Sequence, residues 1–141
     1  EAAGEGRNLQ FCHRMVNFDL PWNPMPIEQR IGRIHRIGQE NEIEILNLCA
    51  RGSVEDYLLE ILDKKINLFE LVIGEVDLII GQLEDHRDFS ERVLEAWASA
   101  SSSEDAAENF SRLSEDVGRA KARYEQVKSL DESLFGEDYE A

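Results

Sequence analysis

Two short apolar runs near the start of the chain predict β-strands. Residues 15–20 read MVNFDL and residues 42–49 read EIEILNLC, and turn residues surround both runs. Their β-branched side chains favour strands that are buried on one or both faces. Between the runs, apolar residues recur at helical spacing over residues 27–37. The order strand, helix, strand is typical of a right-handed crossover in a parallel sheet.

The next part of the chain is predicted to be helical. Ser53 followed by Asp56 forms a capping-box pattern, and apolar residues then recur at helical spacing as far as Val72. A second helical segment is expected over residues 75–84 and a third from about Asp88. The side chains expected to be buried in this third helix are Phe89, Val93, Leu94 and Trp97.

A small-polar break at residues 98–105 precedes the last predicted helix, with Ser102 or Ser103 as its N-cap. The helix is expected to run to about Leu130 and to fray beyond it. Steps of three and four separate its apolar residues, which are Phe110, Leu113, Val117, Ala120, Tyr124 and Val127. This seam predicts a helix packed lengthwise against the preceding elements, with recruitment of a partner helix as the alternative.

The chain of 141 residues is long enough for one modest core, so a single domain with an appendage is expected. Two strands are too few for a complete α/β domain. The chain also begins within a glycine-rich stretch and without methionine. We therefore expect the sequence to be a piece of a larger protein, with an exposed strand edge that promotes self-association.

Charge divides the chain into two unequal parts within a formal net charge of −15. Through Gly52, six arginines stand against seven acidic residues, whereas nine cationic residues stand against 23 acidic ones from Ser53 onward. The second part repels phosphate backbones, so any nucleic-acid contact is expected in the first part.

The sequence predicts neither a metal site nor a membrane segment. Cys12 and Cys49 lack metal-ligand spacing, and the histidines at 13, 35 and 86 are scattered. No apolar run reaches 18 residues and no secretory signal precedes the first strand, which favours an intracellular protein.

Residues 29–39, QRIGRIHRIGQ, carry the most specific chemistry. On a helical wheel, Ile27, Ile31 and Ile34 form one face, which is expected to pack on the sheet. A different arc presents Gln29, Arg30, Arg33 and Arg36. Fixed guanidinium groups suit phosphate oxygens. Gly32 in mid-helix indicates close approach of another segment or ligand. The alternative for the arginines is an ordinary solvated helix surface.

Three blocks of sequence carry a resemblance to a known family. QRIGRIHRIGQ resembles motif VI of superfamily-two helicases, and AAGEGRNLQ is similar to their motif V. HRIGQ together with FDLPWNP resembles the SWI/SNF-type DNA translocases in particular. Residues 51–75 are similar to the helix that ends the second lobe, especially in bacterial members. The resemblance implies an α/β fold: a truncated RecA-like lobe over residues 1–85, followed by an acidic helical extension over residues 86–141.

In this family, two RecA-like lobes close on ATP, and the resemblance implies roles for several residues. Arg33 and Arg36 match the arginine fingers, and Gln29 matches the glutamine that faces the nucleotide cleft. Arg30 stands at a more variable position and receives no role. Pro26 departs from the common pattern, so the helix is expected to begin there and to lose one contact.

Two loops are expected to couple nucleotide to DNA. The residues that match motif V are Gly4, Glu5, Gly6, Arg7, Asn8 and Gln10, with an ordinary tight turn as the alternative. After the first strand, Asp19, Trp22 and Asn23 match the segment that couples the lobes to DNA, although core packing is an alternative for Trp22.

The resemblance implies an ATP-dependent translocase of double-stranded DNA that remodels chromatin or transcription complexes. ATP and Mg²⁺ are then bound mainly by the missing N-terminal lobe, because the sequence contains neither a GxxxxGK[ST] loop nor an acidic Walker-B strand. This piece alone is expected to be inactive. The expected location is the cytoplasm and nucleoid in a bacterium, or the nucleus in a eukaryote. The alternatives are an RNA helicase lobe and an acidic helical interaction module.

Overall fold

The computed structural model describes residues 9, 11–68, 74–85 and 87–135. Strands β1 (Arg14–Asn17) and β2 (Glu44–Asn47) pair in parallel, with Val16 opposite Leu46. Helix α1 (Met25–Ile31) connects them. The predicted order of strand, helix and strand is therefore confirmed, although both strands are shorter than the apolar runs indicated.

The small sheet has one covered face and one open face. Val16 and Leu46 are 57% and 50% exposed, so of the two alternatives left open by the sequence the strands adopt burial on one face. Asn17 points to the covered side, where its amide nitrogen donates to Asn47 Oδ1 over 2.8 Å. The bond joins the two strands through side chains as well as main chains. Self-association through the sheet stays a prediction.

Helices form the remainder of the described chain. Helix α2 (Val54–Ile61) continues into the π-helix η1 (Leu62–Ile66), and α3 (Glu75–Ile80), α4 (Phe89–Ala98) and α5 (Ser103–Phe135) follow. The prediction of one helix reaching Val72 is wrong, because Asn67 adopts a left-handed conformation with φ of 54° after η1. Val72 itself lies outside the described residues. Helix α3 is shorter than predicted, and α5 extends beyond Leu130.

The predicted caps are present at the helix starts. Ser53 Oγ accepts from the Asp56 amide over 3.3 Å, and Asp56 Oδ2 accepts from the Gly52 amide over 2.8 Å. At the start of α5, Ser102 Oγ accepts from the Asp105 amide over 3.1 Å. These bonds satisfy amides that have no partner within a helix, which fixes where each helix begins.

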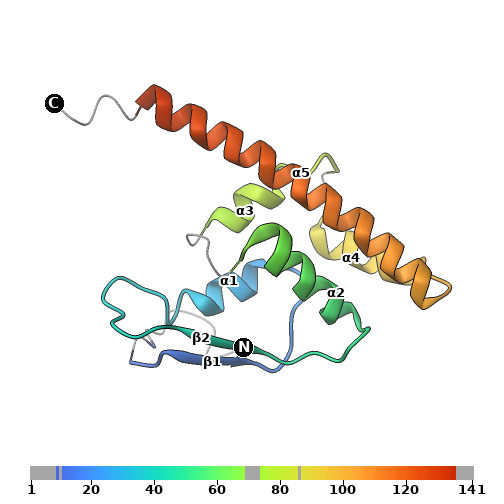
Figure 1. Ribbon diagram of the computed structural model, residues 1–141, viewed down its shortest axis with the longest axis horizontal. Coiled ribbons are helices and arrows are strands. Elements are labelled where there is room, and N and C mark those ends of the chain that lie inside the picture. The colour runs from blue at the N-terminus through green and yellow to red at the C-terminus, as the bar shows by residue number, and fades with distance from the viewer. Residues whose placement is uncertain (1–8, 10, 69–73, 86, 136–141) are drawn as a thin grey trace.

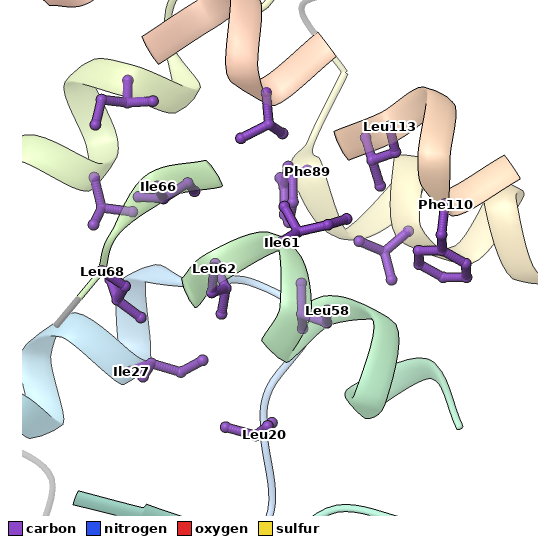
Figure 2. Packing of buried hydrophobic residues seen from close by; sticks show 14 of the residues in the cluster. Leu20, Ile27, Leu58, Ile61, Leu62, Ile66, Leu68, Phe89, Phe110 and Leu113 are labelled. Atoms are coloured by element: carbon purple, nitrogen blue, oxygen red, sulfur yellow. The ribbon is translucent and has the colours of Figure 1, made fainter. Parts of the chain in front are cut away.

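One apolar cluster joins the helices (Figure 2). The labelled side chains, which come from the β1–α1 connection, α1, α2, η1 and the segments after it, are Leu20, Ile27, Leu58, Ile61, Leu62, Ile66, Leu68, Phe89, Phe110 and Leu113. The Tyr57 ring stacks on the Phe110 ring with centroids 4.8 Å apart. Because the cluster continues across residue 85, the two predicted segments share a core, and the boundary between them stays a prediction.

Three of the predicted core residues are exposed instead. Leu94 and Trp97 of α4 are 50% and 39% exposed, and Ala96 is buried in their place. Val127 of α5 is also exposed, whereas Val117 and Ala120 are buried. The lengthwise seam is therefore confirmed over its first part only. Helix phase decides the outcome in α4, since a rotation of 100° per residue separates neighbours on the wheel.

Figure 1 shows the arrangement as tiers, with the sheet on one side, α1 and α2 next to it, and α5 lying across α3 and α4 on the other side. Helix α1 lies beside α3, and α3 lies beside α5. None of the described helices has the length and apolar character needed to cross a membrane.

Candidate functional site

Helix α1, which contains Arg30 and precedes Arg33 and Arg36, begins one residue before the predicted start. Met25 is helical, Pro24 is the N-cap, and Pro26 occupies the first turn, where its missing amide costs nothing. Asn23 Oδ1 accepts from the Met25 amide over 2.9 Å. The expectation that α1 begins at Pro26 is therefore wrong by one residue, and Asn23 has a capping role.

Helix α1 ends at Ile31, so the predicted helix over residues 27–37 is wrong in its second half. Gly32 is the C-cap, with φ of −61°, and residues 33–38 form turns and bends. Gly32 therefore lies at the end of the helix and not in its middle, and the close approach expected there stays a prediction. Ile27, Ile31 and Ile34 are all buried, as the wheel predicted, but the arc of arginines does not continue along one helix. We call residues 32–38 the arginine turn.

Arg30 differs from the other two arginines because it is engaged with the end of β1. Its Nη1 donates to the Asp19 carbonyl over 3.0 Å and to Asn17 Oδ1 over 3.4 Å. The same nitrogen lies 3.6 Å from Asp19 Oδ1. Arg30 thus fixes α1 against the strand, consistent with its exclusion from the predicted site.

Arg33 is half-buried at the start of the arginine turn. Its Nε is buried and has no hydrogen-bond partner among the described residues. Its carbonyl accepts from the Leu9 amide over 3.2 Å. Leu9 belongs to the motif V-like block, so the end of that block lies beside Arg33. Among the described residues the guanidinium group thus retains an unused donor at Nε, which a buried polar atom ordinarily does not.

Arg36 is exposed, and its Nε donates to the Gly32 carbonyl over 2.9 Å. Within the described part of the chain, neither Arg33 nor Arg36 forms an ion pair with a carboxylate. Arg36 lines an open hollow of about 490 Å³. The polar side chains that line the hollow with it are His35, Gln39, Asn41 and Glu42.

Gln39 holds the arginine turn in place, a role that the sequence reasoning missed. Its Nε2 donates to the carbonyls of Cys12 and Ile34 over 3.0 and 3.2 Å, and its Oε1 accepts from the Asn41 amide over 3.1 Å. These bonds join the turn to the segment before β1. The position of Gln39 at the end of the HRIGQ block was the available signal.

Glu28 was also missed, and it lies away from the arginines that flank it in sequence. The residue is only 5% exposed. Its Oε1 accepts from the amides of Gly74 and Val76 over 2.8 and 3.3 Å, at the start of α3. No feature of the local sequence indicates a partner 46 or 48 residues away.

The other predicted residues are spread around this region. Gln29 is exposed on α1 and does not line the hollow. Asp19 is exposed, and Trp22 is half-buried with its Nε1 donating to Glu55 Oε1 over 3.5 Å. The motif V-like residues outside the described part of the chain are Gly4, Glu5, Gly6, Arg7, Asn8 and Gln10. The site assignments as a whole stay predictions.

Comparison with known proteins gives one family match and a similar bacterial relative. Residues 1–38 match the family described as "Helicase conserved C-terminal domain", which agrees with the resemblance found in this segment of the sequence. The chain is also 56% identical over 84 residues to the "Uncharacterized ATP-dependent helicase YqhH" of Bacillus subtilis (strain 168). This match covers 60% of the chain and 15% of that protein. No solved structure matched the chain.

Proposed function

We propose that the arginine turn acts in an ATP-dependent translocase of double-stranded DNA, with Arg33 and Arg36 as arginine fingers. ATP is then held mainly by a partner lobe, and the arginines reach its phosphates from this side. The observation that carries the proposal is the state of the two guanidinium groups. Neither is neutralised by a described carboxylate, although 30 acidic residues are present in the sequence.

The chemistry of phosphoryl transfer accounts for such groups. Negative charge spreads over the oxygens of the transferred phosphoryl group, and a guanidinium group placed beside it stabilises the transition state. A planar fork of donors matches phosphate oxygens better than a lysine ammonium does. The open hollow beside Arg36 gives a ligand access to this donor. Gln39 and the turn keep the arginine backbone in one conformation before the ligand arrives.

Substitution of the two arginines in the full-length protein tests the proposal. We expect Arg33→Ala and Arg36→Ala each to lower the kcat of ATP hydrolysis by on the order of 10³, because each removes charge stabilisation from the transition state. Arg51→Ala is the matched control, since Arg51, like Arg36, is exposed but lies in the turn before α2. Circular dichroism melting checks that each variant folds.

Near-normal turnover in both finger variants would overturn the assignment. Arg36→Lys refines the result, because lysine keeps the charge but loses the bidentate fork, so we expect partial activity. Stimulation of hydrolysis by double-stranded DNA, and not by RNA of equal length, supports the DNA translocase. Stimulation by RNA alone contradicts that substrate and favours the RNA helicase. The interaction module is favoured if charge reversals on α5 abolish a function of the protein while replacement of Arg33 and Arg36 has no effect.

A further inference from the structure

Glu28 is a buried carboxylate at the boundary between α1 and the helices that follow. Burial of a carboxylate is costly unless hydrogen bonds and opposite charge compensate for it. Here two amides at the start of α3 provide the compensation, at 2.8 and 3.3 Å. No cation pairs with Glu28 in the described part of the chain. The side chain therefore connects α1 to α3 specifically.

The main chain of Glu28 leads directly to the arginine turn. Its carbonyl accepts from the Gly32 amide over 2.9 Å, and the Gly32 carbonyl accepts from Arg36 Nε over 2.9 Å. One residue thus contacts α3 through its side chain and the base of the arginine turn through its backbone. Displacement of Glu28 shifts the atom that fixes the Arg36 side chain.

The same connection continues from α3 to α5, which lies on the far side of α3 from α1 (Figure 1). Glu75, the first residue of α3, accepts from the Tyr124 hydroxyl over 2.9 Å and from Lys128 Nζ over 2.7 Å. Desolvation and the bond to Glu75 raise the pKa of Tyr124, and the bond to Glu75 raises the pKa of Lys128. Both donors stay protonated at neutral pH, so the contact persists.

We infer that Glu28 is a positioning residue that fixes the arginine turn to α3 and, through Glu75, to α5. The inference rests on the proposed function, because it concerns how the arginine turn is held for that reaction. It assigns the acidic helical part of the chain a role in the activity of the arginines. Packed elements joined by hydrogen bonds can carry coupling of this kind, and these bonds join α1, α3 and α5.

The experiment measures ATP turnover in the full-length protein carrying Glu28→Ala or Glu28→Gln. Misplacement of a catalytic group by a fraction of an ångström lowers turnover, so we expect kcat to fall about tenfold in Glu28→Ala with little change in KM for ATP. Glutamine keeps an oxygen that accepts from an amide, so Glu28→Gln is expected to recover part of the loss. A merely structural role predicts a lower melting temperature without this difference in kcat.

A variant remote from Glu28 tests the same connection without a change at the buried site. Tyr124→Phe combined with Lys128→Ala removes the hydroxyl and ammonium groups that donate to Glu75 from a half-buried and an exposed position on α5. We expect kcat to fall about threefold in this variant, with a slightly lower melting temperature and an intact fold. Ser129→Ala, at an exposed neighbouring position, is the control and is expected to behave as wild type.

Combination with Arg36→Ala separates this inference from the proposed function. If Glu28 acts through Arg36, then Glu28→Ala lowers kcat by less than about twofold in the Arg36→Ala background. Normal turnover of Arg36→Ala alone would refute the finger role of Arg36, on which this inference depends. Two outcomes would refute the positioning role while the proposed function survives. In the first, Arg36→Ala has a low kcat but the remote variant has a normal one. In the second, the decreases in kcat of Glu28→Ala and Arg36→Ala multiply fully in the double variant.

Discussion

The segment up to Gly52 and the helices after it are stabilised in different ways. Of the 21 buried hydrophobic residues in the described part of the chain, four precede Ser53 and 17 follow it. The first segment instead uses polar side chains bonded to the backbone, notably Asn23, Arg30 and Gln39. Arg33 and Arg36 therefore lie on irregular backbone held by hydrogen bonds, beside helices held by apolar packing.

This difference follows from what each segment presents to solvent. Irregular backbone needs partners for its amides and carbonyls, which helices supply internally and turns do not. In the arginine turn, Gln39 supplies two donor contacts to carbonyls, and Glu28 and Gly32 supply carbonyl acceptors. Such a turn is ordered without being buried, so Arg36 stays exposed to a ligand.

The largest predicted effect is in the helical core. Leu62 is fully buried in η1, so Leu62→Ala is expected to lower the free energy of unfolding by about 2–5 kcal/mol through lost transfer energy and a residual cavity. Urea denaturation of the 141-residue chain measures this change. Leu130→Ala is the control, since Leu130 is 60% exposed and its truncation is expected to cost less than about 0.5 kcal/mol. Equal effects at the two positions would contradict the assignment of the core.

A smaller, local effect is expected in the arginine turn. Gln39→Ala removes bonds to Cys12, Ile34 and Asn41, each worth about 1 kcal/mol, so the turn is expected to open more often. Native-state hydrogen exchange measures the opening as faster exchange of amides in residues 33–41. The helices are expected to keep their protection, because their packing is unaffected. Gln126→Ala on the exposed face of α5 is the control.

Faster exchange throughout the chain in Gln39→Ala would show that the two regions unfold as one unit. The contrast drawn from the buried residues would then be wrong. Unchanged exchange in residues 33–41 would contradict the role of the glutamine, because its hydrogen bonds would contribute no measurable stability to the turn.

Local patterns in the sequence predicted the elements that depend on near neighbours. The capping box at Ser53 and Asp56 is local, and so is the burial of Ile27 and Ile31 on one face of α1. Strand order followed from the alternation of apolar runs and a helical pattern. The end of η1 at Asn67 was not predictable in this way, because apolar residues continue at helical spacing beyond it.

The candidate site was predictable in its residue types and not in its geometry. A helical wheel assumes continuous helix, and Gly32 instead ends α1 with turns behind it. Glu28 was invisible as a connection because its partners, Gly74 and Val76, lie far along the chain. Long-range hydrogen bonds of this kind depend on tertiary packing, which residue spacing does not encode.

The smallest predicted effect concerns a surface ion pair in the segment that connects α3 to α4. It tests whether apolar packing is the main source of stability in the helical part. Arg87 Nε donates to Asp85 Oδ2 over 2.7 Å, and Arg87 Nη1 donates to Glu95 Oε2 over 2.7 Å. The hydrogen bond from Arg87 lowers the pKa of Asp85 from 3.8 to about 2. Because the folded-state pKa is the lower one, the pair stabilises the fold above pH 3.8 and loses this contribution as the pH falls through about 2.

We therefore expect Asp85→Asn to melt slightly below wild type at pH 6, and the difference to vanish between pH 4 and pH 2. Calorimetric melting of both proteins over this pH range measures the difference, and high salt is expected to reduce it. Asp131→Asn, at an exposed position without an ion pair among the described residues, is expected to show no such pH dependence. A loss at pH 6 as large as that in Leu62→Ala would mean that charge, and not apolar packing, holds the helices together. The two regions would then differ in the kind of polar contact that stabilises each of them, and not in whether an apolar core stabilises them.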